Sequence, residues 1–142
     1  MKPNYPDAAR VWQRVMPREQ TQPSMQMLMV QLKQDILFLK QRFKSSSSVA
    51  EQLIREYTDH YYTLKGIALR TGSRFPGEVS PMAGHSLQVC YDHALQRLSA
   101  YQLRISDPAY GPVFRSLAPQ AENHCQKIIQ LSGETARFVT AQ

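Results

Sequence analysis

Cysteine is scarce in this chain, and its two copies lie far apart. Cys90 and Cys125 are the only cysteines among the 142 residues, and neither belongs to a Cys-x-x-Cys pair of the kind that binds metal or exchanges disulfides. Isolated cysteines of this kind indicate buried thiols in a reducing compartment. A disulfide between the two predicted helices that carry them stays open as an alternative.

The chain also lacks the patterns of several common functions. Its six glycines are scattered, so there is no phosphate-binding loop, and it has no G-x-S-x-G nucleophile motif. The most apolar stretch, residues 25–39, contains Lys33 and Asp35 and is too short and too polar to span a bilayer. The first residues lack the apolar segment of a signal peptide. We therefore expect a cytoplasmic protein without a membrane partner.

Positive charge is in excess, but it is not concentrated in a run. Lysine and arginine number 17 against 11 acidic residues, giving a net charge of +6. Lys33, Lys40, Arg42 and Lys44 are interrupted by apolar residues, which favours a solvated surface over a nucleic-acid face. Binding of an acidic partner through the face from Lys33 to Lys44 stays open as an alternative.

Helical periodicity is the strongest signal that the chain does contain. Four segments place apolar residues at intervals of three and four, and no strand-like alternation of any length occurs. The pattern predicts an all-α, up-down four-helix bundle as one domain over residues 24–142. Residues 1–23 contain four prolines, which predicts an extended arm. Trp12 is expected to pin this arm to the bundle.

The predicted bounds of the first two helices come from capping residues. The first helix should run from Ser24 to about Lys44. The second should begin at Ser48, where S-x-x-E forms a capping box, and should end near Thr71 with Gly72 as its stop. Because the connector between them is short, the two helices should be antiparallel neighbours.

A longer connector is predicted to cross from the first pair of helices to the second. It covers residues 73–79, and the Ser-Pro pair at 80–81 then predicts the start of the third helix. The Asp-Pro pair at 107–108 gives the same signal for the fourth helix. That helix should close near Gly133, with residues 134–142 either extending it or fraying.

Two histidines occupy positions that bind metals in some four-helix bundles. His60 and His124 fall on the buried faces of the predicted second and fourth helices. In di-metal carboxylate bundles such a histidine follows a glutamate by three residues. Here Tyr57 and Ala121 hold the glutamate positions. Two divalent ions in an apolar core need several anionic oxygens, so the sequence predicts the scaffold without its carboxylates.

With these features the chain resembles the ferritin-like superfamily, in particular the short rubrerythrin-like domains, over roughly residues 24–131. The resemblance rests on the two histidines, on the long crossover and on the segments 53–60 and 107–124. It implies a ferritin-like four-helix bundle and, in intact members, a di-iron or di-manganese centre. Carried over, it makes His60, His124 and Asp35 the remaining ligands, because the predicted third helix has no acid on its buried face.

Other uses of these residues stay open. The two histidines are typical of core histidines that hydrogen-bond to tyrosine or aspartate on a neighbouring helix, and Asp35 would then accept from one of them. A mononuclear zinc site would use both histidines with Asp35. A rearranged di-metal centre would recruit Glu56 and Glu122 through a register shift at Pro119, where the fourth helix is expected to kink or restart.

The remaining histidines carry no functional expectation. His85 and His93 lie off the predicted apolar faces and are expected to be solvated. We therefore expect a structural or interaction module without a cofactor that kept the bundle and lost the metal, with homodimer formation compatible with its exposed faces. The alternative is a metal-binding oxidoreductase or storage protein with iron or manganese in a rearranged centre.

Overall fold

The chain forms four α-helices in the part that the structure, a computed structural model, describes. Backbone is described for residues 23–141 and side chains for residues 23–134. The helices are α3 (Met25–Phe43), α4 (Ser48–Thr71), α5 (Leu87–Leu103) and α6 (Gly111–Ala141), with the short 3-10 helix η1 (Arg104–Ser106) after α5. The predicted arm and Trp12 lie outside the described residues, apart from Pro23.

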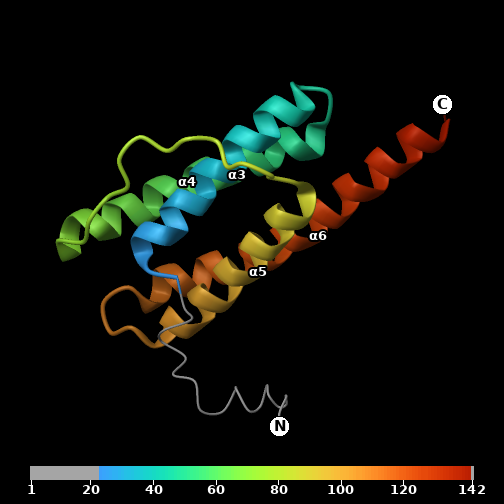
Figure 1. Cartoon of the computed structure of the whole chain (residues 1–142). Helices are drawn as coiled ribbons and strands as arrows, with labels where there is room; N and C mark the ends of the chain where they lie inside the picture. Colours follow the sequence, from blue (N-terminus) through green and yellow to red (C-terminus); the bar gives the residue numbers. More distant parts are fainter. Residues whose placement is uncertain (1–22, 142) are drawn as a thin grey trace, which may run out of the picture.

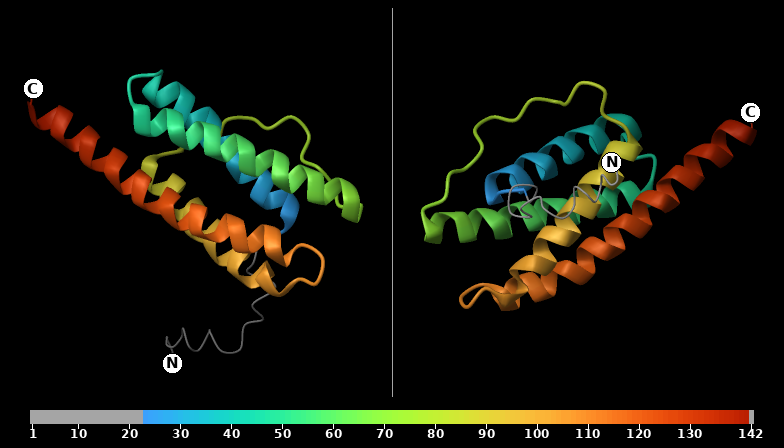
Figure 2. Two further views of the ribbon diagram at one scale, coloured as in Figure 1. Left: turned by 180° about the vertical axis from the view of Figure 1, so that it is seen from behind. Right: turned by 60° about the horizontal axis from the view of Figure 1, so that its bottom comes forward.

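The helices pack as two antiparallel hairpins, α3 with α4 and α5 with α6 (Figure 1). Residues 72–86 cross from the end of α4 to the start of α5. The far end of α6 extends beyond the other helices in both views of Figure 2. These features confirm the predicted all-α four-helix bundle with its long crossover. None of the described helices is long and apolar enough to cross a membrane.

Helix ends in the first hairpin follow local chemistry closely. The Ser24 hydroxyl accepts the Met27 N–H at 3.1 Å and caps α3. At the end of α4, Gly72 takes a left-handed conformation with φ of 74°, which glycine adopts without steric cost. The predicted capping box is wrong by one residue, because Ser47, not Ser48, accepts the Ala50 N–H at 3.2 Å.

The start of α5 differs from its prediction. The Ser-Pro pair at 80–81 does not begin a helix, and the crossover continues to Ser86, whose hydroxyl accepts the Val89 N–H at 3.2 Å. Helix α5 then begins at Leu87. The longer crossover, which turns at residues 83–84, brings His85 onto α3, where it contacts Asp35.

Helix α6 also begins later than the predicted start at the Asp-Pro pair 107–108. The Asp107 carboxylate accepts the N–H groups of Ala109 and Tyr110, both at 2.8 Å, which holds a turn instead of a helix start. Helix α6 begins at Gly111, where a Cβ atom would collide with the carbonyl oxygen of Ile105. Only glycine therefore fits this close approach of two backbone segments.

Helix α6 is longer and more continuous than predicted. It runs through Pro119 without restarting, and it passes Gly133 to reach Ala141. Pro119 lies on the exposed side of the helix, where a backbone carbonyl that loses its helical partner faces water. The predicted closure at Gly133 is wrong, and residues 134–141 extend the helix.

One apolar core joins the two hairpins, and it contains several polar side chains. Cys90 and Cys125 are buried free thiols, as predicted, so the alternative of a disulfide is wrong. The buried polar residues are Gln31, Asp35, His60, His93, Arg97 and His124. Because buried polar groups are costly unless they are paired, these six residues are the candidates for a functional site.

Candidate functional site in the bundle core

The first group of polar side chains, the Asp35 cluster, comprises Asp35, His85, His93 and Arg97. Asp35 Oδ1 lies 2.8 Å from His85 Nε2 and 2.8 Å from His93 Nδ1. Arg97 donates from Nη1 to Asp35 Oδ2 at 3.1 Å. His93 and Arg97 stand one turn apart on α5, while His85 comes from the end of the crossover. The cluster therefore ties α3, the crossover and α5 together.

The charges of Asp35 and Arg97 neutralise each other within the Asp35 cluster. Burial alone would raise the pKa of Asp35, but hydrogen bonds with His85 and His93 and the charge of Arg97 hold it below its usual value. Arg97 is fully buried, and Tyr57 and Asp35 raise its pKa despite the cost of burial. Its guanidinium carbon lies 4.7 Å from the centre of the Tyr57 ring. An ionised pair thus occupies the middle of the bundle.

Several polar atoms around this pair have no hydrogen-bond partner among the described residues. They are Tyr57 Oη, Arg97 Nε, Arg97 Nη2 and His124 Nδ1, together with Gln31 Oε1. These atoms come from all four helices of the bundle. Because most buried polar atoms have a hydrogen-bond partner, these five atoms make the polar region the part of the core that apolar packing does not explain.

The second group, the Glu56 cluster, comprises Glu56, His124 and Lys127 and joins α4 to α6. His124 Nε2 lies 2.8 Å from Glu56 Oε1, and Lys127 donates to Glu56 Oε2 at 3.1 Å. The side chain of Glu56 is 26% exposed. Burial raises the pKa of Glu56, but hydrogen bonds with Lys127 and His124 lower it below its usual value overall. This cluster therefore sits at the rim of the core.

The predicted pair of histidines is buried and adjacent. The ring centres of His60 and His124 are 5.0 Å apart. His60 Nδ1 contacts the Tyr101 hydroxyl at 3.2 Å, and its Nε2 contacts Gln120 Oε1 at 3.0 Å. Burial lowers the pKa of His60, and burial, the neighbouring His60 ring and the charge of Arg97 lower the pKa of His124 to about 3. Both rings are neutral at neutral pH.

The structure divides the predicted ligands among different places. Glu56 and His124 meet, whereas Asp35 belongs to the other cluster and Glu122 is exposed. Among the described residues, one group of three potential ligands converges: Asp35, His85 and His93, whose ligand atoms lie within 4.8 Å of one another.

The expectation that His85 and His93 are solvated is wrong. Their side chains are only 5% and 10% exposed. A signal for His93 and Arg97 existed in the sequence, because they follow Cys90 by three and seven residues, which is the spacing of one helix face. For His85, which lies outside any helix, no periodic signal was available.

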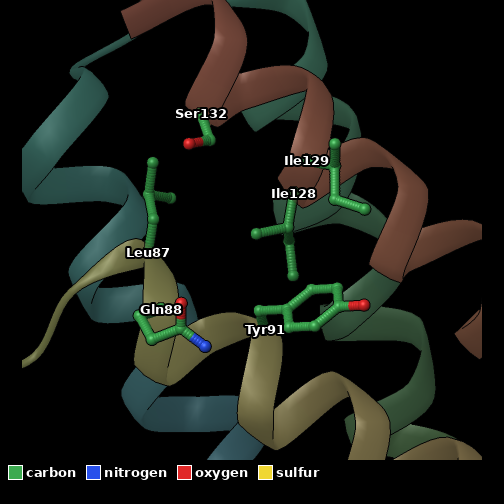
Figure 3. Close-up of a pocket in the computed structure, with 6 residues that line it drawn as sticks. All are labelled: Leu87, Gln88, Tyr91, Ile128, Ile129 and Ser132. Carbon is green, nitrogen blue, oxygen red and sulfur yellow. The ribbon is translucent and has the colours of Figure 1, made fainter. Parts of the chain in front are cut away.

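Outside the two clusters, an apolar recess lies between α5 and α6 (Figure 3). Its lining residues are Leu87, Gln88, Tyr91, Ile128, Ile129 and Ser132. It contains no carboxylate, imidazole, thiol or amine, so it offers contact surface but no acid–base or metal chemistry.

The predicted basic face lies on α3. Lys40, Arg42 and Lys44 are exposed at the end of this helix, while Lys33 Nζ lies 4.7 Å from the centre of the Tyr61 ring.

Comparison of the chain with protein-family models, with curated proteins and with solved structures finds no match.

Proposed function

We propose that this protein is a structural or interaction module, a ferritin-like bundle of the rubrerythrin-like kind in which side chains take the place of a di-metal centre. Tyr57 and Ala121 stand where the resemblance implies carboxylates, and both are buried. The main support for this proposal is the buried Arg97 guanidinium, which lies over the Tyr57 ring and pairs with Asp35. A fixed cation in this region takes the role that metal ions have in intact bundles of that family.

The charge balance of the core supports this reading. Asp35 is paired with Arg97, and Glu56 is paired with Lys127, so the two carboxylates supply too little negative charge for two divalent ions. Two divalent cations beside Arg97 would therefore carry a large unbalanced charge in a buried place. The rearranged centre that uses Glu56 and Glu122 is not supported, since Glu122 is exposed on α6.

Metal analysis of the purified protein tests the proposal. Protein from iron- and manganese-supplemented medium is compared with the variants His60→Gln and His124→Gln. We expect no di-metal content and no difference in iron or manganese between the three proteins. About two metal ions per chain in the wild type, lost in both variants, would show that the bundle is a di-metal protein and that the proposal is wrong.

Self-association is the partner arrangement that we propose for such a module, because exposed faces of bundles commonly pair around a two-fold axis. Light scattering coupled to size exclusion gives the mass directly. A homodimer has twice the mass of the 16.3 kDa chain. A mass equal to one chain at all accessible concentrations would exclude the homodimer and leave partners of other kinds.

A further inference from the structure

Both ring nitrogens of His85 face oxygen atoms that accept hydrogen bonds. Nε2 lies 2.8 Å from the Asp35 carboxylate, and Nδ1 lies 3.2 Å from the carbonyl oxygen of Ser86. A neutral imidazole has only one N–H, so one nitrogen would direct a lone pair at an oxygen. The shorter contact is the one to the carboxylate, and a cation shared by Nε2 and Asp35 Oδ1 removes the repulsion there.

We propose that Asp35, His85 and His93 bind one divalent transition-metal ion of the zinc type. Two imidazoles and one carboxylate form a familiar zinc ligand set that leaves a further coordination position open. Asp35 Oδ1, His85 Nε2 and His93 Nδ1 converge within 4.8 Å. This site uses neither His60 nor His124 and shares only Asp35 with the ligands that the resemblance implies, so it goes beyond the proposed function.

The surroundings of the three ligands fit this role. With Nε2 bound to the metal, the Nδ1–H of His85 would donate to the Ser86 carbonyl oxygen, which lies 3.2 Å away. A contact of this kind fixes the orientation of a metal-bound histidine. Arg97 binds Asp35 Oδ2 and leaves Oδ1 directed at the two imidazoles. Phe38 stacks on the His85 ring with centres 4.4 Å apart and planes within 8°, so the ring is held in place before any ion arrives.

Arg97 also weakens the site, because it shares the charge of the single carboxylate. A compensating anion has a place to bind. The His85 ring borders an open pocket that Phe38, Arg42, Lys44 and Met82 also line. This pocket opens to solvent beside His85, and the positive charges of Arg42 and Lys44 that line it favour an anion there. The bound metal would fasten the crossover, through His85, to α3 and α5.

Zinc titration of the intact protein tests the site. We expect one zinc ion per chain by calorimetry and a rise in Tm with added zinc. Cobalt as a spectroscopic probe should give visible absorption bands from nitrogen and oxygen ligands. The variants His85→Gln, His93→Gln and Asp35→Asn should each weaken zinc binding by roughly tenfold or more, since loss of an outer contact alone costs that much.

The control variant is His60→Gln, which removes a buried histidine that is not a ligand in this proposal. It should bind zinc like the wild type. His85→Gln is the most informative ligand variant, because His85 lies outside the helices and its loss leaves the helical core intact; circular dichroism checks that it folds. Absence of zinc binding to the wild type, or equal binding to His85→Gln and wild type, would overturn the proposal.

The outcomes separate this inference from the proposed function. One ion lost with His85→Gln supports the inference and leaves the proposed function standing. Two ions lost with His60→Gln refute the proposed function instead. Imidazole proton signals that show His85 doubly protonated in zinc-saturated solution would mean that a proton, not a metal, bridges His85 and Asp35, and would also overturn the inference.

Discussion

The Asp35 cluster and the Glu56 cluster contain the same kinds of groups at different depths. Each joins a carboxylate to histidine and to a cationic side chain. The side chain of Asp35 is 0% exposed, whereas that of Glu56 is 26% exposed. Water therefore reaches one ion pair and not the other. A buried charge that loses its partner is costly, while a pair at the rim is partly screened. Depth, more than chemical composition, should decide what each cluster contributes.

Removing the buried carboxylate should produce the largest effect. Asp35→Asn keeps the shape of the side chain but leaves the Arg97 cation buried without its counter-charge. We expect a loss of about 3–5 kcal/mol in the free energy of unfolding, measured by urea denaturation in the presence of EDTA. Asp92→Asn is the matched control, because Asp92 lies on α5 and is exposed; it should change stability little. A loss for Asp35→Asn no larger than that of the control would contradict the comparison.

Removing the buried cation as well should return part of this loss. The double variant with Asp35→Asn and Arg97→Met should be more stable than Asp35→Asn alone, because no unpaired charge remains. The coupling free energy between the two positions should be on the order of 1–3 kcal/mol. A double-mutant cycle measures it, and additive effects of the two substitutions would show that the pair does not act as a unit.

Acidification should reveal the neutral histidines beside the Glu56 cluster. The pKa of His124 falls from 6.5 to about 3 on folding, so the unfolded chain binds more protons between these values and stability decreases as the pH falls. From pH 6.5 to about pH 5, where carboxylates stay ionised, His124 should account for about 2 kcal/mol of lost stability. In His124→Gln the slope of stability against pH should be shallower by one proton. Equal slopes in both proteins would refute a neutral buried His124.

Removing the carboxylate at the rim should have the smallest effect. Glu56→Gln loses the ion pair with Lys127 but keeps an acceptor for its neighbours, so we expect a loss on the order of 1 kcal/mol. Added salt should weaken the wild-type contribution of this pair, whereas the Asp35 pair should respond little. If Glu56→Gln cost as much as Asp35→Asn, depth would not be the deciding variable.

The sequence predicted the first hairpin better than the second. Ser24 and Gly72 end their helices through contacts within a few residues, and such contacts are readable from a local pattern. Ser80 followed by Pro81 carries an equally good local signal, yet no helix starts there. The chain instead stays outside any helix until Ser86, which lets His85 reach Asp35 fifty residues earlier in the sequence. Local capping rules cannot predict such long-range contacts.

In the candidate site, too, the sequence predicted local features but not the contacts between helices. The periodicity of α4 and α6 placed His60 and His124 in the core, and the structure buries both. The periodicity did not show which acidic side chain each histidine contacts. Glu56 reaches His124 from α4, and Asp35 turns to His93 on α5. Helix rotation and crossing position decide these pairings, and neither is encoded in the spacing of residues along one helix.

By itself the sequence determined four amphipathic helices and two buried histidines, because helical periodicity and residue type are local properties. Only the tertiary structure decided that Arg97 is neutralised by Asp35 and that His85 and His93 converge on the same carboxylate. The physical reason is that a buried charge must find its partner wherever the packed helices bring one within reach. That partner can lie on any element, including a crossover with no regular pattern.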